Sequence, residues 1–553
     1  MASPRANGMR SGQRTLQPLD MTRSLLEDQR IAWVLAAVSF LLFLIGNLPW
    51  QLDDYDQAKQ AFTSFQMIKE GRWLYQQTPH EHVATKPPLV GWVSAGLFGL
   101  TRSWDLSWRL PSFLAAIALA VLLFRSADAA YGLTAGLIAL GAFGLNLLSP
   151  RLATLVRTDM PLALVIFLVG VLIWKKIQRQ EEWKPRDRIY LFALLAVAML
   201  IKGPIVYAFL LPGIALFQWR YGRARPKLVL SEVEGGAPPQ AQENSCSHGA
   251  VSPCRESQGE RLDTARRLQG GWSGWWPWIA SLVVFLLWVI GGILFQPGFF
   301  DEVVMREFLA RFGETIHRPQ PLYFYLPHLL HKLAPWSVLM IAIALADLHS
   351  RKWRLRSAFR DMSPEIFWLL CWSLGGLIVM SLIPSKRVDR IFPIVPPLCL
   401  LLAAQISGRV GVLRRPPNAF GATLRSYLAI ALAFAILFTG AYTISKVISG
   451  YRHHRDALVV FGRDVRRAAA AHHWRYEIVS AKHEGLLLYL QKTHFIEPDH
   501  AITEWNSDNL DALIASTEKV PTLMRELKNA SFSNLKSSGR KEEQGKGYVL
   551  ITR

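Results

Sequence analysis

The chain contains a series of long apolar segments, and these constrain its fold more than any other feature. A helix that crosses a lipid bilayer needs about 20 mostly apolar residues. Hydrophobic residues make up 51% of the chain, which favours a membrane protein over a soluble one. We predict about eleven membrane-spanning helices, at 31–50, 109–124, 131–148, 160–174, 189–201, 203–219, 275–296, 333–349, 365–383, 390–406 and 426–445.

Two of the apolar segments need a separate argument. The run 189–219 would be about 46 Å long as one helix, at 1.5 Å per residue. "IKGP" at 201–204 interrupts it, and a charge, a glycine and a proline together predict a turn between two helices. The run 87–100 is short and rich in Gly and Pro. We predict that it is an interfacial helix on the outer face and does not cross the membrane.

The distribution of basic residues supports this topology. With a cytoplasmic N-terminus and no crossing at 87–100, every strongly basic loop falls in the cytoplasm, as the positive-inside rule requires. The same rule accounts for the formal net charge of +21 without nucleic-acid binding. We therefore predict a multi-pass cell-membrane protein with an extracytoplasmic C-terminus. The basic loops are 175–188, 220–274, 351–360 and 409–420.

The polar segments divide the chain into further parts. The tail 1–30 is polar and Arg-rich, with no cleavable signal peptide, so we expect the first apolar run to remain as an anchor. The membrane domain is predicted at 31–445. Within it, 220–274 is polar and aperiodic, which indicates a disordered cytoplasmic loop or an insertion.

The C-terminal part, 446–553, has the pattern of a small α/β domain outside the cytoplasm. Strand character occurs at 476–481 and 547–552. Helical spacing occurs at 483–493 and at 507–516, the second beginning with a Ser cap.

The topology collects ionisable residues of both signs on the outer loops. Any one of them is explained as an ordinary charge at the headgroup level, but charges at helix ends that face a bundle interior mark substrate paths. Cations suit a phosphate, and a carboxylate suits a general base. A lipid-linked phosphate at the outer leaflet would use both. These residues are Asp53, Asp54, Asp56, Lys59, Glu81, His82, Lys86, Arg151, Arg157, Asp159, Lys202, Glu307, Arg311, His317, Arg318, Lys386, Arg387, Asp389 and Arg390.

Several motifs, taken in order, resemble one known family. "DQAKQAFTSFQMIKEGRW" (56–73) and "KPPLVGW" (86–92) are similar to the first outer loop of bacterial polyprenol-phosphate-dependent membrane glycosyltransferases. That family includes the protein O-mannosyltransferases and the lipid A aminoarabinose transferases. The resemblance continues through "RTDMPL" (157–162), "IKGP" (201–204), "PLYFYLPHLLHKLAPW" (321–336) and "PSKRVDRIFPIVPP" (384–397).

The resemblance implies a GT-C fold and transfer of a sugar from a polyprenyl-phosphate donor to a lipid, glycan or protein acceptor on the outer face. It implies that Asp56 is the catalytic base. It also implies that Asp159 is a second acidic residue of the catalytic site, which orients the acceptor or a cation. Gln57 stands where the family commonly has Glu, so the role of that second carboxylate is either lost or taken by Asp53 or Asp54. Either Lys386 or Arg387 is expected to stabilise the charge of the donor phosphate. The residues expected to bind substrate are Asp53, Asp54, Lys86, Arg157, Lys202, His317, Lys386 and Arg387.

The cofactor prediction follows from the kind of donor. A polyprenyl-phosphate sugar needs no nucleotide and no nucleotide-bound metal, so no cofactor is required. A divalent ion near Asp56, Asp159, Glu81 and His82 stays open as an alternative.

Two other classes of protein remain as alternatives. A transporter or lipid flippase would show inverted repeats and broken helices at the midplane, whereas here the charges lie at helix ends. A non-catalytic scaffold that presents its outer domain would not need acidic and basic groups on five loops.

Overall fold

The structure is a computed structural model. It describes residues 29–52, 55–80, 82–221, 271–309, 320–412, 419–479, 481, 483–536 and 547–553. The predicted loop or insertion at 220–274 lies almost entirely outside these residues, as does most of the N-terminal tail.

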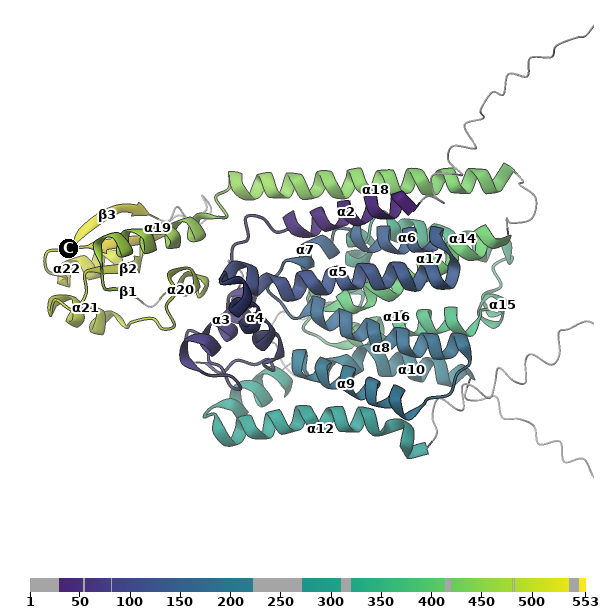
Figure 1. The fold of residues 1–553 in the computed structure, drawn as a ribbon, viewed down its shortest axis with the longest axis horizontal. Coiled ribbons are helices and arrows are strands. Elements are labelled where there is room, and N and C mark those ends of the chain that lie inside the picture. The colour runs from purple at the N-terminus through teal and green to yellow at the C-terminus, as the bar shows by residue number, and fades with distance from the viewer. Residues whose placement is uncertain are drawn as a thin grey trace, which may run out of the picture.

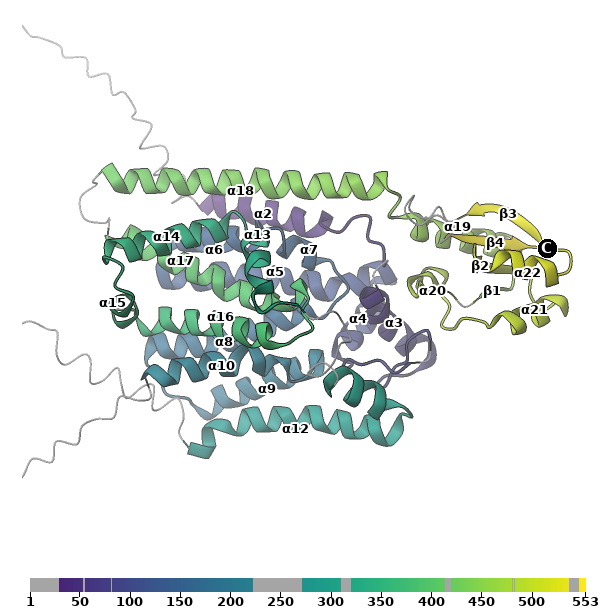
Figure 2. The same cartoon turned by 180° about the vertical axis from the view of Figure 1, so that it is seen from behind.

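Long helices form a layered bundle in which the helix axes run in nearly the same direction (Figure 1, Figure 2). Every segment predicted to cross the membrane overlaps one of these helices. They are α2 (Gln29–Ile45), α5 (Trp104–Tyr131), α6 (Leu133–Gly144), α8 (Asp159–Arg179), α9 (Pro185–Lys202), α10 (Ile205–Tyr221), α12 (Gly271–Phe295), α14 (Trp336–Ser350), α16 (Pro364–Leu382), α17 (Val395–Val412) and α18 (Ala419–Arg452).

The length and composition of these helices are those of a multi-pass membrane protein. Within the described ranges, six helices are long and apolar enough to cross a bilayer, or seven with a pair bent by 105° at Leu322–Lys332 and Trp336–Ser350. Helices α2 and α6 are apolar but shorter. The polytopic helical class is therefore confirmed, and the number of eleven crossings stays a prediction.

Small residues allow two central helices to approach closely. A Cβ atom on Gly375 of α16 would lie 2.4 Å from the backbone nitrogen of Gly213 in α10. A Cβ on Gly213 would in turn lie 2.9 Å from the Cα of Trp372. No side chain fits between these backbones, so the glycines set the distance between α10 and α16.

Two helices lie across one end of the bundle, α3 (Tyr55–Glu70) and α4 (Leu89–Thr101). Helix α4 has 13 residues, about 20 Å at 1.5 Å per residue, which is shorter than a bilayer core. Its place at the bundle end agrees with the prediction that 87–100 does not cross. The remaining short elements are α7 (Ser149–Ala153), η1 (Phe300–Leu309), η2 (Leu322–Phe324), α13 (Tyr325–Lys332), α15 (Leu355–Arg360) and η3 (Val388–Ile394).

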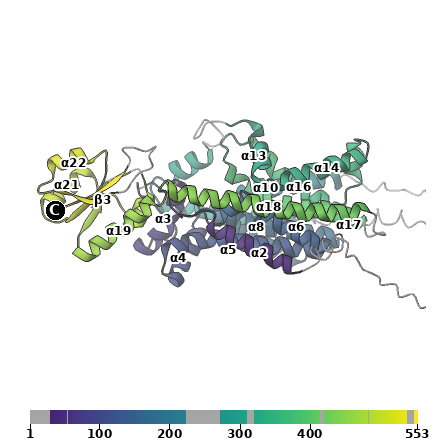
Figure 3. The same ribbon diagram turned by 90° about the horizontal axis from the view of Figure 1, so that it is seen from above.

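The C-terminal residues form a small domain beyond α3 and α4 (Figure 1, Figure 3). Its four-stranded sheet has the order β1-β2-β4-β3, with β1 and β2 parallel and the other pairs antiparallel. Its elements are α19 (Ala457–His472), β1 (Tyr476–Ile478), α20 (Gly485–Leu490), α21 (Pro498–Asn506), β2 (Ala512–Ser516), α22 (Val520–Glu526), β3 (Ser531–Lys536) and β4 (Tyr548–Thr552).

One prediction for this domain is wrong. The segment 507–516 was expected to be a helix, but its second half is β2, and Ser507 ends α21 instead of capping a new helix. Four of the five β2 residues are buried, because the strand lies in the centre of the sheet between β1 and β4. Periodicity does not distinguish a short, fully buried strand from a buried helix.

Candidate active site

The first turn of α3 places Asp56 against basic side chains from two distant segments. Asp56 accepts a hydrogen bond from the Arg387 guanidinium group. Arg157 Nη2 lies 3.8 Å from Asp56 Oδ2, and Arg157 Nη1 donates to Asp389 Oδ2 at 2.7 Å. One chain of ion pairs therefore joins α3, the turn before α8 and the start of η3.

A second ion pair joins the beginning of α8 to the end of α9. Asp159 is the first residue of α8, Lys202 is the last residue of α9, and Lys202 Nζ donates to Asp159 Oδ1. Helix α9 ends there because the next residue, Gly203, has a φ angle of 74°, a conformation that favours glycine. The break predicted at "IKGP" thus brings the ammonium group to Asp159.

Lys86, just before α4, interacts with members of both ion-pair groups. Burial lowers the pKa of Lys86 to about 8; Lys202 and Arg157 lower it as well, and the carboxylates of Asp56 and Asp159 act in the opposite direction. We therefore group Lys86 with both sets of ion pairs because of these charge interactions. We call the following residues the charged cluster: Asp56, Lys86, Arg157, Asp159, Lys202, Arg387 and Asp389.

The charged cluster strongly favours an ionised Asp56. Burial alone would raise the pKa of this carboxyl group, but Lys86, Arg387 and Arg157 outweigh burial and lower the pKa to about 2. With all groups ionised, the charged cluster has four cations and three carboxylates. The excess positive charge suits an anionic ligand such as a phosphate.

Buried polar side chains hold the turn before α8 in place. Arg109, buried within α5, donates to the carbonyl of Thr154 at 3.0 Å. Ser112, one turn later in α5, donates to the carbonyl of Leu155 at 2.7 Å. These bonds orient Arg157 toward the charged cluster. Neither residue was predicted from the sequence, although an Arg inside an apolar span is by itself a signal of a polar role.

Gln57, which departs from the family motif, is a structural contact in this chain. Its side chain is buried, and Oε1 accepts a hydrogen bond from the backbone N–H of Val156 at 3.2 Å. Gln57 therefore ties α3 to the turn that carries Arg157. An amide oxygen makes this bond without adding a charge beside Asp56.

Other residues predicted to bind substrate lie elsewhere or outside the described ranges. Lys386 is buried and donates to the carbonyl of Gln320 at 2.9 Å. The sequence left open whether Lys386 or Arg387 binds the phosphate. In the structure, Arg387 is the one that contacts Asp56. Asp53, Asp54 and His317 lie outside the described residues.

The residues considered for a divalent ion do not converge in the described part of the chain. His82 Nδ1 lies 3.0 Å from Glu302 Oε1 in η1, and the other Glu302 oxygen accepts from the N–H of Val83 at 2.6 Å. Glu81 lies outside the described residues. Among those that are described, no group of three His, Cys, Asp or Glu residues could hold a metal ion.

The C-terminal domain contacts the same end of α3, a contact the sequence analysis did not predict. The N–H of Leu52 donates to the hydroxyl of Tyr489 at 2.5 Å. A Cβ on Gly485 would lie 2.4 Å from the carbonyl oxygen of Leu52, so the backbone segments touch. The preceding residue, Glu484, is 3% exposed, and neither carboxylate oxygen has a hydrogen-bond partner in the described part.

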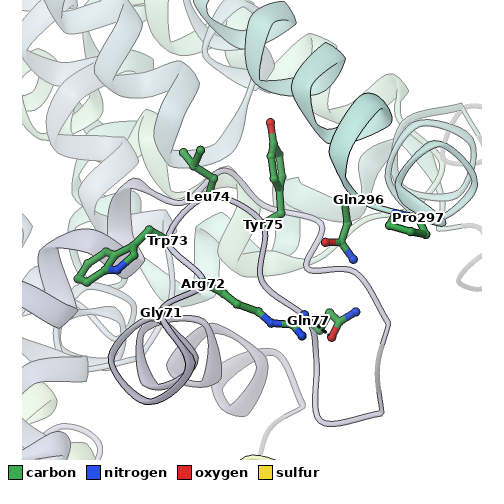
Figure 4. Close-up of a pocket in the computed structure, with 8 residues that line it drawn as sticks. All are labelled: Gly71, Arg72, Trp73, Leu74, Tyr75, Gln77, Gln296 and Pro297. Atoms are coloured by element: carbon green, nitrogen blue, oxygen red, sulfur yellow. Dashed lines mark hydrogen bonds between the residues drawn. The ribbon is translucent and has the colours of Figure 1, made fainter.

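An open hollow lies at the other end of α3, where the chain turns toward the end of α12 (Figure 4). It is lined by Arg72, Trp73 and Tyr75, with Gln296 opposite, and Arg72 donates to Gln77 at 2.6 Å. The hollow shares no residue with the charged cluster. We therefore place the candidate active site at the charged cluster and not in this hollow.

Comparisons with known proteins agree with this architecture. Residues 85–230 match the family described as dolichyl-phosphate-mannose-protein mannosyltransferase. The chain is 27% identical over 170 residues to an undecaprenyl phosphate-alpha-4-amino-4-deoxy-L-arabinose arabinosyl transferase of Serratia proteamaculans. It is 26% identical over 183 residues to the protein of that name from Yersinia enterocolitica. These alignments span 31% and 33% of this chain, and only 29% and 31% of the relatives.

A solved structure extends the likeness to nearly the whole chain. The structure of ArnT from Cupriavidus metallidurans bound to undecaprenyl phosphate matches with a TM-score of 0.62 at 14% sequence identity. The match covers 95% of this chain and 98% of that one. The fold is therefore that of ArnT, and the predicted resemblance to polyprenol-phosphate-dependent membrane glycosyltransferases is confirmed.

Proposed function

We propose that this chain is a membrane glycosyltransferase that moves a sugar from a polyprenyl-phosphate donor to a lipid, glycan or protein acceptor. The observation that carries the proposal is the charged cluster, which combines a carboxylate with several cations at one end of the helix bundle. The curated relatives are named for transfer of 4-amino-4-deoxy-L-arabinose. A pentose is therefore the first sugar to test, and a hexose is the second.

In the proposed reaction, Asp56 acts as the general base. The acceptor hydroxyl gives its proton to Asp56 while its oxygen forms a bond to the anomeric carbon of the sugar. The bond between that carbon and the phosphate oxygen breaks, and the electron pair remains on the polyprenyl phosphate. Lys86, Arg157, Lys202 and Arg387 stabilise this anion, which is an electrostatic role.

The ion pairs suggest how binding of the donor activates Asp56. Without a donor, Arg387 and Arg157 interact with Asp56 and keep its pKa near 2, which makes it a weak base. A bound phosphate competes for the same guanidinium groups. The pKa of Asp56 then rises toward the range in which a carboxylate accepts a proton efficiently.

The other predicted residues complete the proposed site. We assign Asp159 to the orientation of the acceptor. We also propose that four further residues contact the substrate, namely Asp53, Asp54, His317 and Lys386. The reaction requires no cofactor, and a divalent ion stays open as an alternative.

The topology is part of the proposal. We propose eleven crossings, with the N-terminus in the cytoplasm and the C-terminal domain outside. A reporter that is active only outside the cytoplasm should work when fused after Arg553, and a reporter inserted at 230–260 should behave as cytoplasmic. The reverse pattern would contradict the topology.

The decisive test of the activity uses the purified protein in nanodiscs with a radiolabelled polyprenyl-phosphate sugar. We expect transfer of the label to an acceptor and release of polyprenyl phosphate. The same donor in sealed vesicles distinguishes the alternative. Movement across the membrane with the sugar–phosphate bond intact would favour a transporter or flippase and contradict the proposal.

A further inference from the structure

A mostly apolar pocket that contains one arginine lies at the end of the bundle opposite to the charged cluster. It is formed by the ends of α8, α9, α10, α12 and α16, and the residues that matter here are Trp183, Arg188, Trp275, Trp278 and Trp368. Arg188 and Lys202 lie on the same helix, 14 positions apart, which corresponds to about 21 Å along its axis. The pocket therefore lies toward the other end of α9 from Lys202, and the proposed topology places that end on the cytoplasmic side.

Two hydrogen-bond donors in this pocket are buried without an acceptor. Among the described residues, neither Nε of Arg188 nor the indole Nε1 of Trp183 has a hydrogen-bond partner. Trp368, in the same pocket, does have one, because its Nε1 donates to the carbonyl of Gly170 at 3.1 Å. A buried donor without an acceptor is unfavourable, so Arg188 and Trp183 point to a ligand that supplies acceptor oxygens.

The neighbouring carboxylates do not neutralise Arg188. Asp187, the preceding residue, lies 2.7 Å from Lys176 Nζ and accepts from the backbone N–H of Lys184 at 3.0 Å. Glu181 lies 3.1 Å from the same Lys176 nitrogen. These acidic groups are engaged with other cations, so the charge available to a ligand at Arg188 is positive, and the ligand should be an anion.

The surroundings of the pocket are those of a lipid site. Next to Arg188 on α9, Ile189 is 59% exposed and Tyr190 is 48% exposed. On α12, Ile279 is exposed beside the pocket residue Trp278. Exposed apolar side chains on helices of this length face acyl chains, and tryptophans gather at the headgroup level. Arg188 is the basic residue of this pocket, and a basic group in a pocket between such helices attracts an anionic headgroup.

We propose that this pocket binds the phosphate headgroup of an anionic phospholipid, held by the Arg188 guanidinium and the Trp183 indole N–H. The lipid lies in the leaflet opposite to the charged cluster, and its acyl chains run along α9 and α12. This site does not depend on the proposed enzymatic activity, since its ligand and its residues are separate from the charged cluster.

The test is native mass spectrometry of the full chain taken from nanodiscs that contain phosphatidylglycerol and phosphatidylcholine. The wild-type protein should retain phosphatidylglycerol in preference to phosphatidylcholine. Arg188→Gln should lower the retained phosphatidylglycerol about tenfold, because a hydrogen bond to a charged group is lost. Trp183→Phe should lower it about threefold, since it keeps the ring and removes only a neutral donor.

Arg186→Gln is the matched control, because Arg186 is an exposed residue of the same helix that does not line the pocket. It removes the same charge and should retain lipid as the wild type does. An equal loss in both arginine variants, or equal retention of the two lipids, would overturn the proposal. Displacement of the lipid by millimolar inorganic phosphate would also overturn it, since the site would then recognise a soluble anion.

Discussion

Asp56 and Glu484 are two carboxyl groups at the same end of the molecule, and the protein shifts their pKa values in opposite directions. Asp56 lies in the first turn of α3, and Glu484 precedes α20, which packs on α3. Burial raises the pKa of both, but three cations beside Asp56 lower its pKa to about 2. Lys59 and His82 only partly offset the burial of Glu484, whose pKa rises to about 7.

The difference shows that the partners of a buried acid, more than its burial, decide its charge. Asp56 is ionised at all physiological pH values, and the ion pairs around it are preorganised for an anion. Glu484 has no hydrogen-bond partner for its carboxylate among the described residues and binds a proton near neutral pH. We therefore expect the two acids to respond differently to neutralisation and to pH.

The largest effect is expected for Asp56→Asn. This variant keeps the size and polarity of the side chain but removes the proposed base, so turnover should fall at least about a hundredfold. Donor affinity should not decrease, because the phosphate binds the cations and the asparagine no longer competes for them. Steady-state kinetics and donor binding measure the two quantities. Asp301→Asn, which changes an exposed acid of η1, is the control, and wild-type turnover in Asp56→Asn would refute the base assignment.

Asp159→Asn tests the second carboxylate of the charged cluster. It weakens the pair with Lys202 and disturbs the orientation of the acceptor, without removing the base. We expect turnover to fall by roughly tenfold to fiftyfold, which is less than for Asp56→Asn. Equal kcat values in the two variants would mean that Asp56 and Asp159 act as one unit.

Lys86 provides a pH test of the charged cluster. Its pKa of about 8 means that the ammonium group is present below this pH and is lost above it. Donor affinity should therefore decrease as the pH rises through about 8, and Lys86→Arg should remove this decrease. Lys86→Ala should weaken donor binding about tenfold at pH 7. A donor affinity of the wild type that is constant from pH 7 to 9 would contradict the role of Lys86.

The smallest effect is expected for Glu484→Gln and concerns stability. The pKa of Glu484 is raised from 4.5 to about 7, so between these values the folded state holds a proton that the unfolded state releases. The free energy of unfolding therefore decreases as the pH rises through this window. The wild-type Tm should fall by a few degrees from pH 5 to 8.

Glu484→Gln should show a smaller decrease in Tm over the same range, since glutamine does not titrate. Glu526→Gln changes an exposed residue of the same domain and should retain the wild-type slope. Identical slopes for all three proteins would show that Glu484 is not the source of the pH dependence.

Much of the membrane domain could be predicted from local features of the chain. The length of an apolar run and the charges beside it are properties of neighbouring residues, so the helices and the short α4 were predicted close to their observed positions. Four residues of the charged cluster could also be predicted from the sequence, because each lies near an end of an apolar run. They are Asp56, Arg157, Asp159 and Lys202.

Contacts between distant segments could not be predicted in this way. Only the tertiary structure decided that Arg387, and not Lys386, reaches Asp56, 331 positions away in the chain. Only the tertiary structure placed Glu484 of the C-terminal domain on α3. The reason is that pairing and burial depend on which segments meet, whereas the tendency of a segment to form a helix in a membrane is a property of that segment alone.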